Sequence, residues 1–367
     1  MTLTNYWWPL IWLFLGGAIF GNMPKRRERL NGEIVERWDV WPAIMMVLPY
    51  IIWAGFRGSI ADTWMYRVGF LNAEVSLSAI PAILADPNRK DVGYEVFVVL
   101  MRYVIGENPD LFFLVIAAIQ GLCMALAFRR FSSHYWISIF LFVASTDYMS
   151  WMMNGMRQFV AVTVIFACFD WMVRKKYLPL ILVILGVSTF HQSALLMIPI
   201  IFIVQGKAWN GKIILVLVVT VAVVAFTDRF TPVLNDMLQN TNYDTALGED
   251  MLSWDDGTNV IRVLVYSVPA LLSLIGLRYV RSANDPVINV SVNCAIVTMA
   301  LYLVAMVTSG IYIGRLPIYT TLQGYIAVPW LIHNIFEHRS AKFVMNMMVL
   351  LFCAFYYYQM FLTWSYG

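Results

Sequence analysis

The stretch HYWISIFLFVASTDYMSWMMNGMRQFVAVTVIFACFDWMV, residues 134–173, decides the class of fold. It consists of two strongly apolar runs on either side of the polar segment NGMRQF at 154–159. A helix needs about 20 apolar residues to cross the hydrocarbon core of a bilayer, within a range of about 17 to 25. The stretch therefore predicts two membrane helices, the second of which begins with an asparagine, an arginine and a glutamine.

The composition of the whole chain points to the same class. Of its 367 residues, 60% are hydrophobic and 13% are charged, whereas a soluble domain carries about 25% charged residues. The four cysteines lie inside apolar runs, which predicts neither a disulfide framework nor a cysteine metal site. The N-terminal segment lacks the basic region of a cleaved signal peptide, so we expect the first apolar run to remain as a membrane helix.

Apolar runs of this kind recur along the chain and predict an all-α polytopic membrane protein, residues 1–367 forming a single integral membrane domain. We expect about twelve transmembrane helices. They are 6–22, 39–56, 110–128, 134–150, 154–173, 177–190, 192–205, 212–227, 259–277, 287–310, 316–336 and 343–364. No internal repeat and no soluble domain is recognisable in the sequence.

Basic residues set the expected orientation, because Lys and Arg are enriched in cytoplasmic loops. An N-terminus outside the cell places Lys or Arg in every inside loop, beginning with Lys25 to Arg37. Two long loops then lie outside, at about 57–109 and about 228–258. The first contains DVGYEVFVVLMRYVIG, which we interpret as an amphipathic helix at the outer surface. The second is acidic and rich in asparagine, as expected of a cap or lid.

Four arginines depart from this bias and lie at the outer ends of predicted spans. An arginine near the centre of a membrane helix costs about 2.5–3.5 kcal/mol, and less near the interface, so several together suggest a function. Polar residues accompany them at helical spacing, and an anion is their natural partner. The arginines and companions are Arg57, Tyr66, Asn154, Arg157, Gln158, Asn259, Arg262, Arg315 and Tyr319.

Three further residues could exchange a proton on the same side: Asp62, Glu95 and His191. Guanidinium groups bind phosphate through two parallel hydrogen bonds and stay charged, while a carboxylate or histidine can act as general base on a hydroxyl. The combination suits a phosphate-bearing amphiphile. The sequence contains no dinucleotide, P-loop, zinc-protease or serine-hydrolase motif, so no cofactor, metal or nucleic acid is expected.

Five segments carry a resemblance to a known family: FRGSIADTWMY at 56–66, GYEVF at 93–97, NGMRQFVAV at 154–162, FHQSAL at 190–195 and GRLPIY at 314–319. In order and spacing they resemble the EpsG family of Wzy-like polysaccharide polymerases, over about residues 50 to 320. The chain departs from that pattern at Ala61, where family members often have glycine.

The resemblance implies a GT-C-type glycosyltransferase of the bacterial cytoplasmic membrane, with its active site facing the periplasm or cell exterior. It would join undecaprenyl-pyrophosphate-linked oligosaccharide repeat units into O-antigen, capsule or exopolysaccharide. The arginines would bind pyrophosphate, and Asp62, Glu95 or His191 would take the acceptor proton, with Asp62 favoured. Its expected partners are membrane lipids and the chain-length regulator and flippase of the same pathway.

Three other functions use similar residues. A flippase for lipid-linked sugars also needs cationic groups, but transporters tend to place them near the membrane midplane and often in repeated halves. A polysaccharide ligase shares the chemistry of the polymerase. A membrane O-acyltransferase is the third alternative.

Overall fold

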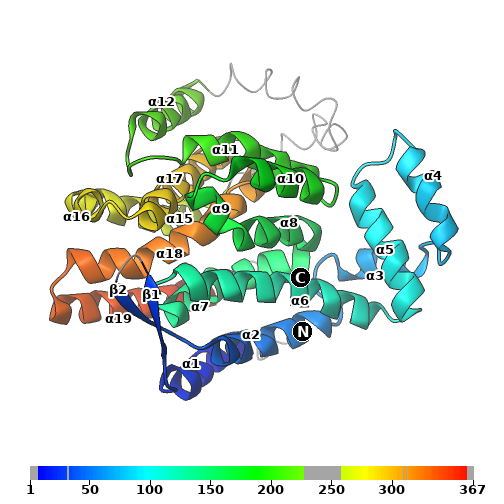
Figure 1. Ribbon diagram of the computed structural model, residues 1–367, viewed down its shortest axis with the longest axis horizontal. Coiled ribbons are helices and arrows are strands. Elements are labelled where there is room, and N and C mark those ends of the chain that lie inside the picture. Colours follow the sequence, from blue (N-terminus) through cyan, green and yellow to red (C-terminus); the bar gives the residue numbers. More distant parts are fainter. Residues whose placement is uncertain (1–6, 31–32, 227–257, 309, 311, 362–367) are drawn as a thin grey trace. The chain divides into compact units, whose positions relative to one another are not determined.

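The computed structural model describes residues 7–30, 33–226, 258–308, 310 and 312–361 (Figure 1). The predicted outer loop at 228–258 therefore lies almost entirely outside the described residues. Contacts within the chain divide it into two compact units, one of residues 1–198 with 337–367 and one of residues 199–336. Each unit consists mainly of helices. That the chain forms a single membrane domain stays a prediction.

The first unit contains the N-terminal helices, the predicted first outer loop and the C-terminal helix (Figure 1). Its elements are α1 (Trp8–Gly21), β1 (Arg26–Leu30), β2 (Glu33–Arg37), α2 (Val40–Gly55), α3 (Thr63–Leu71), η2 (Leu77–Ala79), α4 (Ile80–Ala85), α5 (Val92–Ile105), α6 (Pro109–Phe131), α7 (Tyr135–Ala144), η3 (Tyr148–Asn154), α8 (Met156–Ala167), α9 (Phe169–Val173), α10 (Tyr177–Ser188), η4 (Gln192–Leu196) and α19 (His338–Gln359).

The hairpin of β1 and β2 corrects the prediction that every element is helical. The two strands are antiparallel, and Arg26 pairs with Arg37 across them. They occupy the first predicted inside loop, where the segment is too polar to enter the bilayer and too short to form another span. The helix predicted in the first outer loop is confirmed as α5, and α3, η2 and α4 precede it there.

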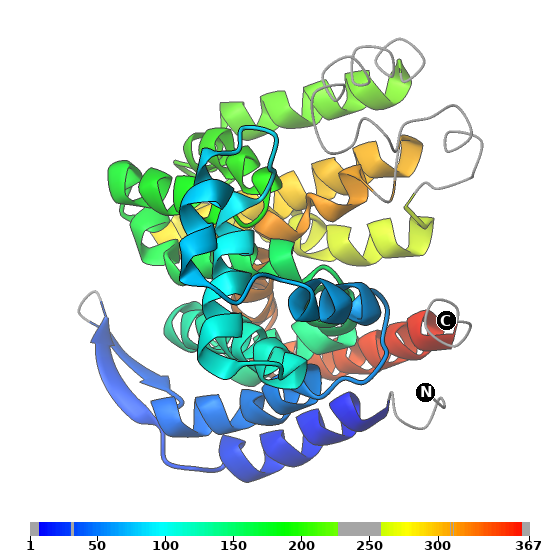
Figure 2. The same ribbon diagram turned by 90° about the vertical axis from the view of Figure 1, so that its right-hand side faces the viewer.

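The centre of the first unit is the pair α2 and α6, which run alongside each other in both ribbon views (Figures 1 and 2). Glycines allow their backbones to approach, as small residues do at helix interfaces in membranes. A Cβ at Gly55 would lie 2.9 Å from Cα of Leu114, and one at Gly121 would overlap the side chain of Ile51. Helix α8 packs on the other side of α6, and α19 packs against α7.

Both ends of this helix pair carry arginines. At one end, Arg129 Nε of α6 donates to the carbonyl of Trp38 at 2.8 Å, and Arg130 pairs with Asp170 at 2.9 Å. At the other end, Arg57 follows α2 and lies 4.5 Å from the ring of Phe113 in α6. The predicted topology assigns these two groups to opposite faces of the membrane, which agrees with their positions at opposite ends of one helix pair.

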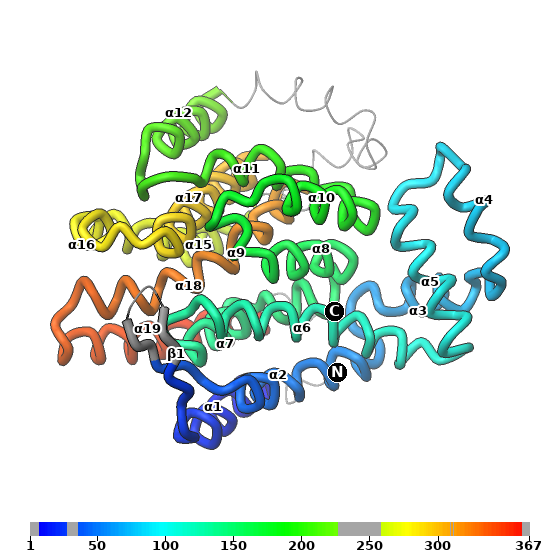
Figure 3. Tube along the Cα trace, viewed as in Figure 1, coloured from blue at the N-terminus to red at the C-terminus, as the bar shows by residue number. Residues whose placement is uncertain are grey.

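The second unit is built around α17 (Pro286–Val307), whose neighbours are α12 (Gly211–Ala225), α15 (Val260–Ile275) and α18 (Ile318–Ile335). The trace in Figure 3 shows their course through the unit. Two buried asparagines of α17 hold the turn before α12: Asn289 Oδ1 accepts from the amide of Ala208 at 3.0 Å, and Asn293 Oδ1 accepts from that of Trp209 at 3.1 Å. Shorter elements are α16 (Leu277–Ala283) and η6 (Ile313–Arg315), while α11 (Met197–Ile203) crosses from the first unit into the second.

Each of the twelve predicted spans coincides with one or two helices, but few of these helices could cross a bilayer alone. Among the described residues, three are long and apolar enough: α6, α17 and α19. A fourth span results if α15 and α16, which meet at a bend of 69°, are taken together. The other spans are shorter or broken apolar helices, such as α7 with η3 and α8 with α9. The fold is that of an all-α membrane protein apart from its hairpin.

The close approach of α2 and α6 yields a test of this packing. We expect Gly55→Ala to lower the free energy of unfolding by about 1–2 kcal/mol, because its Cβ meets the backbone of Leu114. The matched control is Gly186→Ala in α10, where nothing lies within 4 Å of the new Cβ, and alanine should stabilise the helix by about 0.5–1 kcal/mol. Thermal unfolding of the purified protein in detergent measures both. Equal effects of the two substitutions would contradict the packing.

Candidate functional site

A break in the helical path after α7 shapes the candidate site. The chain takes a left-handed conformation at Thr146, with φ of 71°, and continues as the π-helical segment η3 before α8 begins at Met156. Gly155 fits at the junction because a Cβ there would lie 2.8 Å from the indole of Trp151. Such π-helical segments often occur at functional sites. The break leaves backbone carbonyls that need donors from elsewhere in the chain.

Arg57 supplies these donors. Its Nη1 donates to the carbonyls of Met152 and Met153 at 3.0 and 2.8 Å, and its Nη2 lies 3.5 Å from the sulfur of Met156. The residue is 1% exposed, and burial lowers the pKa of its guanidinium to about 10. The contacts of Arg57 with Met152, Met153 and Met156 hold the junction between η3 and α8, and its predicted contact with substrate stays a prediction.

Arg157, in the first turn of α8, lies in a cluster of polar and aromatic side chains. Its Nε donates to the hydroxyl of Tyr66 at 3.3 Å, and its Nη1 pairs with Oδ2 of Asp91 at 3.0 Å. The guanidinium also lies 5.7 Å from the ring of Tyr66 and 5.2 Å from that of Tyr94, within the range of cation–π attraction. Three elements, α3, α5 and α8, thus meet at one arginine.

Asp91 joins this cluster to the segment that contains His191. The residue precedes α5 in a left-handed conformation, with φ of 56°, and its side chain is 8% exposed. Its carboxylate also accepts a hydrogen bond from the backbone amide of Gln192. Burial raises the pKa of Asp91 above its ordinary value, although the positive charge of Arg157 opposes the shift. The sequence offered one signal for Asp91, its position two residues before the GYEVF segment.

His191 follows α10 and stands next to this contact. Its Nδ1 lies 2.7 Å from the hydroxyl of Ser193. The amide of Tyr94 donates to the carbonyl of Thr189 at 3.3 Å, and a Cβ at Gly93 would overlap the side chain of Thr189. The start of α5 therefore lies against the end of α10. Three segments quoted from the sequence, GYEVF, NGMRQF and FHQSAL, come together in the fold.

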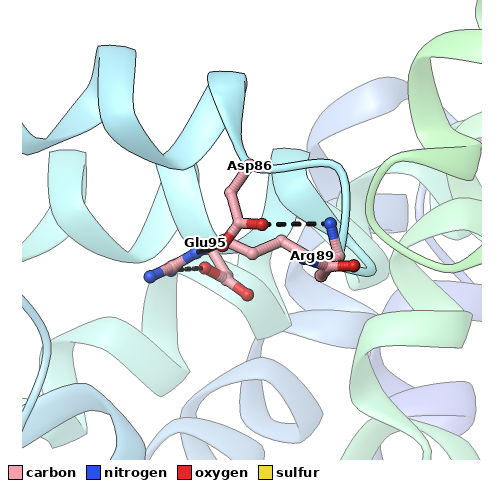
Figure 4. Close-up of polar contacts among 4 residues, drawn as sticks. Asp86, Arg89 and Glu95 are labelled. Atoms are coloured by element: carbon pink, nitrogen blue, oxygen red, sulfur yellow. Dashed lines mark hydrogen bonds and ion pairs between the residues drawn. The ribbon is translucent and has the colours of Figure 1, made fainter.

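Glu95 faces a different environment. It pairs with Arg89, which also contacts Asp86 at 3.3 Å, and the three side chains form a surface network (Figure 4). The side chains of Arg89 and Glu95 are 45% and 35% exposed. Exposed pairs of this kind contribute little to stability, about 0–1 kcal/mol. Glu95 thus pairs with a surface arginine, Arg89, rather than with Arg157.

Asp62 lies in the loop between Arg57 and α3. Its carbonyl accepts from the amide of Tyr66 at 3.2 Å, so it stands one turn before that residue. The preceding Ala61 has φ of 47°, in the left-handed region, where alanine costs about 1–2 kcal/mol and glycine fits freely. The backbone turn that glycine favours is thus formed here by alanine.

The two polar neighbours of Arg157 differ in exposure. Asn154 ends η3 and is half-buried, and its Oδ1 has no hydrogen-bond partner among the described residues. Gln158 is 2% exposed, so it faces the interior of the unit. Of these two residues, Asn154 is the one whose side-chain oxygen, Oδ1, can accept a hydrogen bond from a ligand.

The remaining predicted residues lie in the second unit. Asn259 caps α15, its Oδ1 accepting from the amide of Ile261 at 2.8 Å. Arg262 lies 5.7 Å from the ring of Tyr266 in the next turn, which in turn stacks on Tyr302. Arg315 is exposed at the end of η6, and Tyr319 is buried in α18. Among the described residues, no three His, Cys, Asp or Glu side chains are grouped to hold a metal ion.

The buried contacts of Arg57 predict a structural cost when it is replaced. We expect Arg57→Gln to lower the free energy of unfolding by at least about 2 kcal/mol, because two carbonyls lose charged hydrogen bonds. The control Arg89→Gln removes an exposed arginine and should change it by less than about 1 kcal/mol. Thermal unfolding in detergent compares the two. A loss for Arg57→Gln no larger than the control's would contradict this role.

Comparison with known proteins places the chain in a family. A search of curated proteins and a search of solved structures each found no significant match. A family model, by contrast, matches residues 40–366, and it describes the EpsG family. The match includes α2 to α19 and all five segments that carry the resemblance in the sequence. The chain therefore belongs to the EpsG family.

Proposed function

We propose that this protein is a polymerase that joins undecaprenyl-pyrophosphate-linked oligosaccharide repeat units at the outer face of the bacterial cytoplasmic membrane. Membership of the EpsG family indicates a membrane protein of the polysaccharide-polymerase type, a glycosyltransferase-like enzyme. The proposal also includes four finer points: the undecaprenyl carrier, action at the outer face of the membrane, a GT-C architecture and about twelve spans.

One observation carries the proposal: Arg157 stands at the start of a broken membrane helix, with Asp91, Tyr66 and Tyr94 around it. Its side chain is 32% exposed, and its hydrogen bonds to Tyr66 and Asp91 use Nε and Nη1. A guanidinium has five N–H donors, so Nη2 can bind a phosphate oxygen. An anion held there would sit at the end of α2 and α6 opposite Arg129 and Arg130.

The chemistry follows from that position. Transfer of a sugar from pyrophosphate leaves negative charge on the lipid carrier, and a fixed cation stabilises that charge as it develops. Arg157 does this in the first unit. Arg262 and Arg315, which the sequence also predicts to bind pyrophosphate, lie in the second unit. Arg57 holds the helix break from which Arg157 projects.

The other predicted residues complete the proposal. Asn154 and Tyr66 offer hydrogen bonds to the donor, while Gln158, Asn259 and Tyr319 support the elements that carry the arginines. Asp62, Glu95 and His191 remain the candidates from the sequence for general base, and Asp62 and His191 flank the cluster. A chain-length regulator and a flippase are the expected partners.

Polymerisation by the purified protein tests the proposal. With a matching undecaprenyl-pyrophosphate-linked repeat unit, the wild type should give a ladder of products on a gel. Arg157→Ala should slow the reaction by about 10²–10³-fold, the cost of removing one group that stabilises developing charge. Arg157→Lys should restore only part of the rate, because lysine lacks the planar pair of donors.

Two further variants interpret the result. Asp62→Asn should abolish the ladder if Asp62 takes part in the reaction. Arg130→Ala, at the opposite end of α6, is the matched control and should retain the ladder. Absence of a wild-type ladder, with movement of the lipid-linked sugar across proteoliposomes instead, would replace the polymerase with a flippase. Full activity of Arg157→Lys would show that paired hydrogen bonding to phosphate is not required.

A further inference from the structure

Asp91 is a buried carboxylate whose bonding is incomplete. Its Oδ2 pairs with Arg157 at 3.0 Å, whereas its Oδ1 is buried without a hydrogen-bond partner among the described residues. The side chain is more than nine-tenths buried, at 8% exposed. An unused carboxylate oxygen at this depth is costly. It lies within the same cluster that would hold the pyrophosphate.

The backbone fixes this carboxylate in place. Asp91 has a left-handed conformation, with φ of 56°, and it opens α5, whose first turn is held against Thr189 by the amide of Tyr94. The amide of Gln192 donates to the same carboxylate. Arg157 and the amide of Gln192 thus fix the carboxylate, and the backbone of Asp91 has a conformation that few residues other than glycine adopt. Such strained backbone is often found where a side chain must be held in place for function.

We propose that Asp91 is the general base of the transfer reaction, an inference that rests on the proposed function. The hydroxyl of the acceptor sugar donates to Oδ1 of Asp91. As its oxygen bonds to the anomeric carbon of the donor sugar, its proton moves to Asp91. The bond from that carbon to the pyrophosphate oxygen breaks, and its electron pair stays on the lipid pyrophosphate, where Arg157 stabilises the charge. The proton then passes from Asp91 to solvent.

The contacts of the other candidates favour Asp91. Glu95 pairs with Arg89 at the surface, and His191 Nδ1 already contacts the hydroxyl of Ser193. Asp62 stands one turn before Tyr66, and its backbone carbonyl accepts from the amide of Tyr66. The carboxylate of Asp91 pairs with Arg157 itself, so base and cation lie side by side.

Electrostatics supports the same role. Burial raises the pKa of Asp91 above 3.8 against the opposing charge of Arg157, and a more basic carboxylate is a better proton acceptor at neutral pH. The charged and titratable groups that act on it are Arg157 from α8 and Lys90, Tyr94 and Glu95 from its own segment. Tyr66 from α3 contacts the same Arg157, and His191 is the sequence neighbour of Gln192. Because the base must be ionised, the rate should fall as the pH drops through the raised pKa of Asp91.

The experiment measures initial polymerisation rates from pH 4 to 8 for purified wild type, Asp91→Asn, Asp91→Glu and Asp86→Asn. Asp86→Asn is the matched control, since it makes the same change in an exposed carboxylate of the same loop. We expect Asp91→Asn to lower kcat by about 10²–10⁴-fold, the usual contribution of a general base. The half-saturating donor concentration should change less than threefold, and the acid limb of the pH profile should vanish. Asp91→Glu should recover part of kcat with a displaced acid limb.

A merely structural role for Asp91 gives different results. If Asp91 only orients Arg157, Asp91→Asn should weaken donor saturation and keep the wild-type acid limb, and either result overturns the proposal. If Asp91→Asn does not fold, Asp91→Glu decides: a displaced limb supports the base, and an unchanged limb overturns it. A wild type that makes no polymer contradicts the proposed function itself, which is a separate outcome.

Discussion

The contact on which the first unit depends is the one between the guanidinium of Arg57 and the carbonyls of Met152 and Met153. A chain that breaks its helix inside a packed core must satisfy the freed backbone groups from within the protein, because a buried carbonyl without a donor is costly. Arg57 does so from the end of α2, with the ring of Phe113 against its face at 4.5 Å. The break can then persist between η3 and α8, and α8 can begin with Arg157 at its first turn.

From that arrangement the rest of the candidate site follows. Arg157 projects from the start of α8, Tyr66 reaches it from α3, and Asp91 reaches it from the start of α5. Asp91 extends the network to the amide of Gln192, next to His191. Each contact joins segments far apart in the sequence, so the site exists only when α2, α6 and α8 are packed.

The sequence predicts the helices well and the contacts between them poorly. Apolar runs locate the helices because burial in lipid requires them, and the amphipathic pattern of DVGYEVFVVLMRYVIG locates α5. The hairpin was missed, although Asn31-Gly32 between two short polar runs is a hairpin signal. Asp91 was missed because its significance depends on Arg157, which is distant in the chain. The pairing of Glu95 with Arg89 could not be predicted, because helical periodicity does not show that Arg89 folds back onto it.

The four arginines at the outer ends of predicted spans show why sequence position alone does not distinguish a substrate-binding arginine from a structural one. Arg57 and Arg157 are alike in sequence terms, yet one is 1% exposed with carbonyl partners and the other has a side chain that is 32% exposed with a carboxylate partner. A carbonyl contact inside a helix break cannot be exchanged without opening the fold. The partly exposed guanidinium of Arg157 keeps its contact with Asp91 through Nη1 and can offer Nη2 to another anion, since a guanidinium has several donors. A donor that can reach a ligand, rather than the presence of an arginine, therefore distinguishes a ligand site from a structural one.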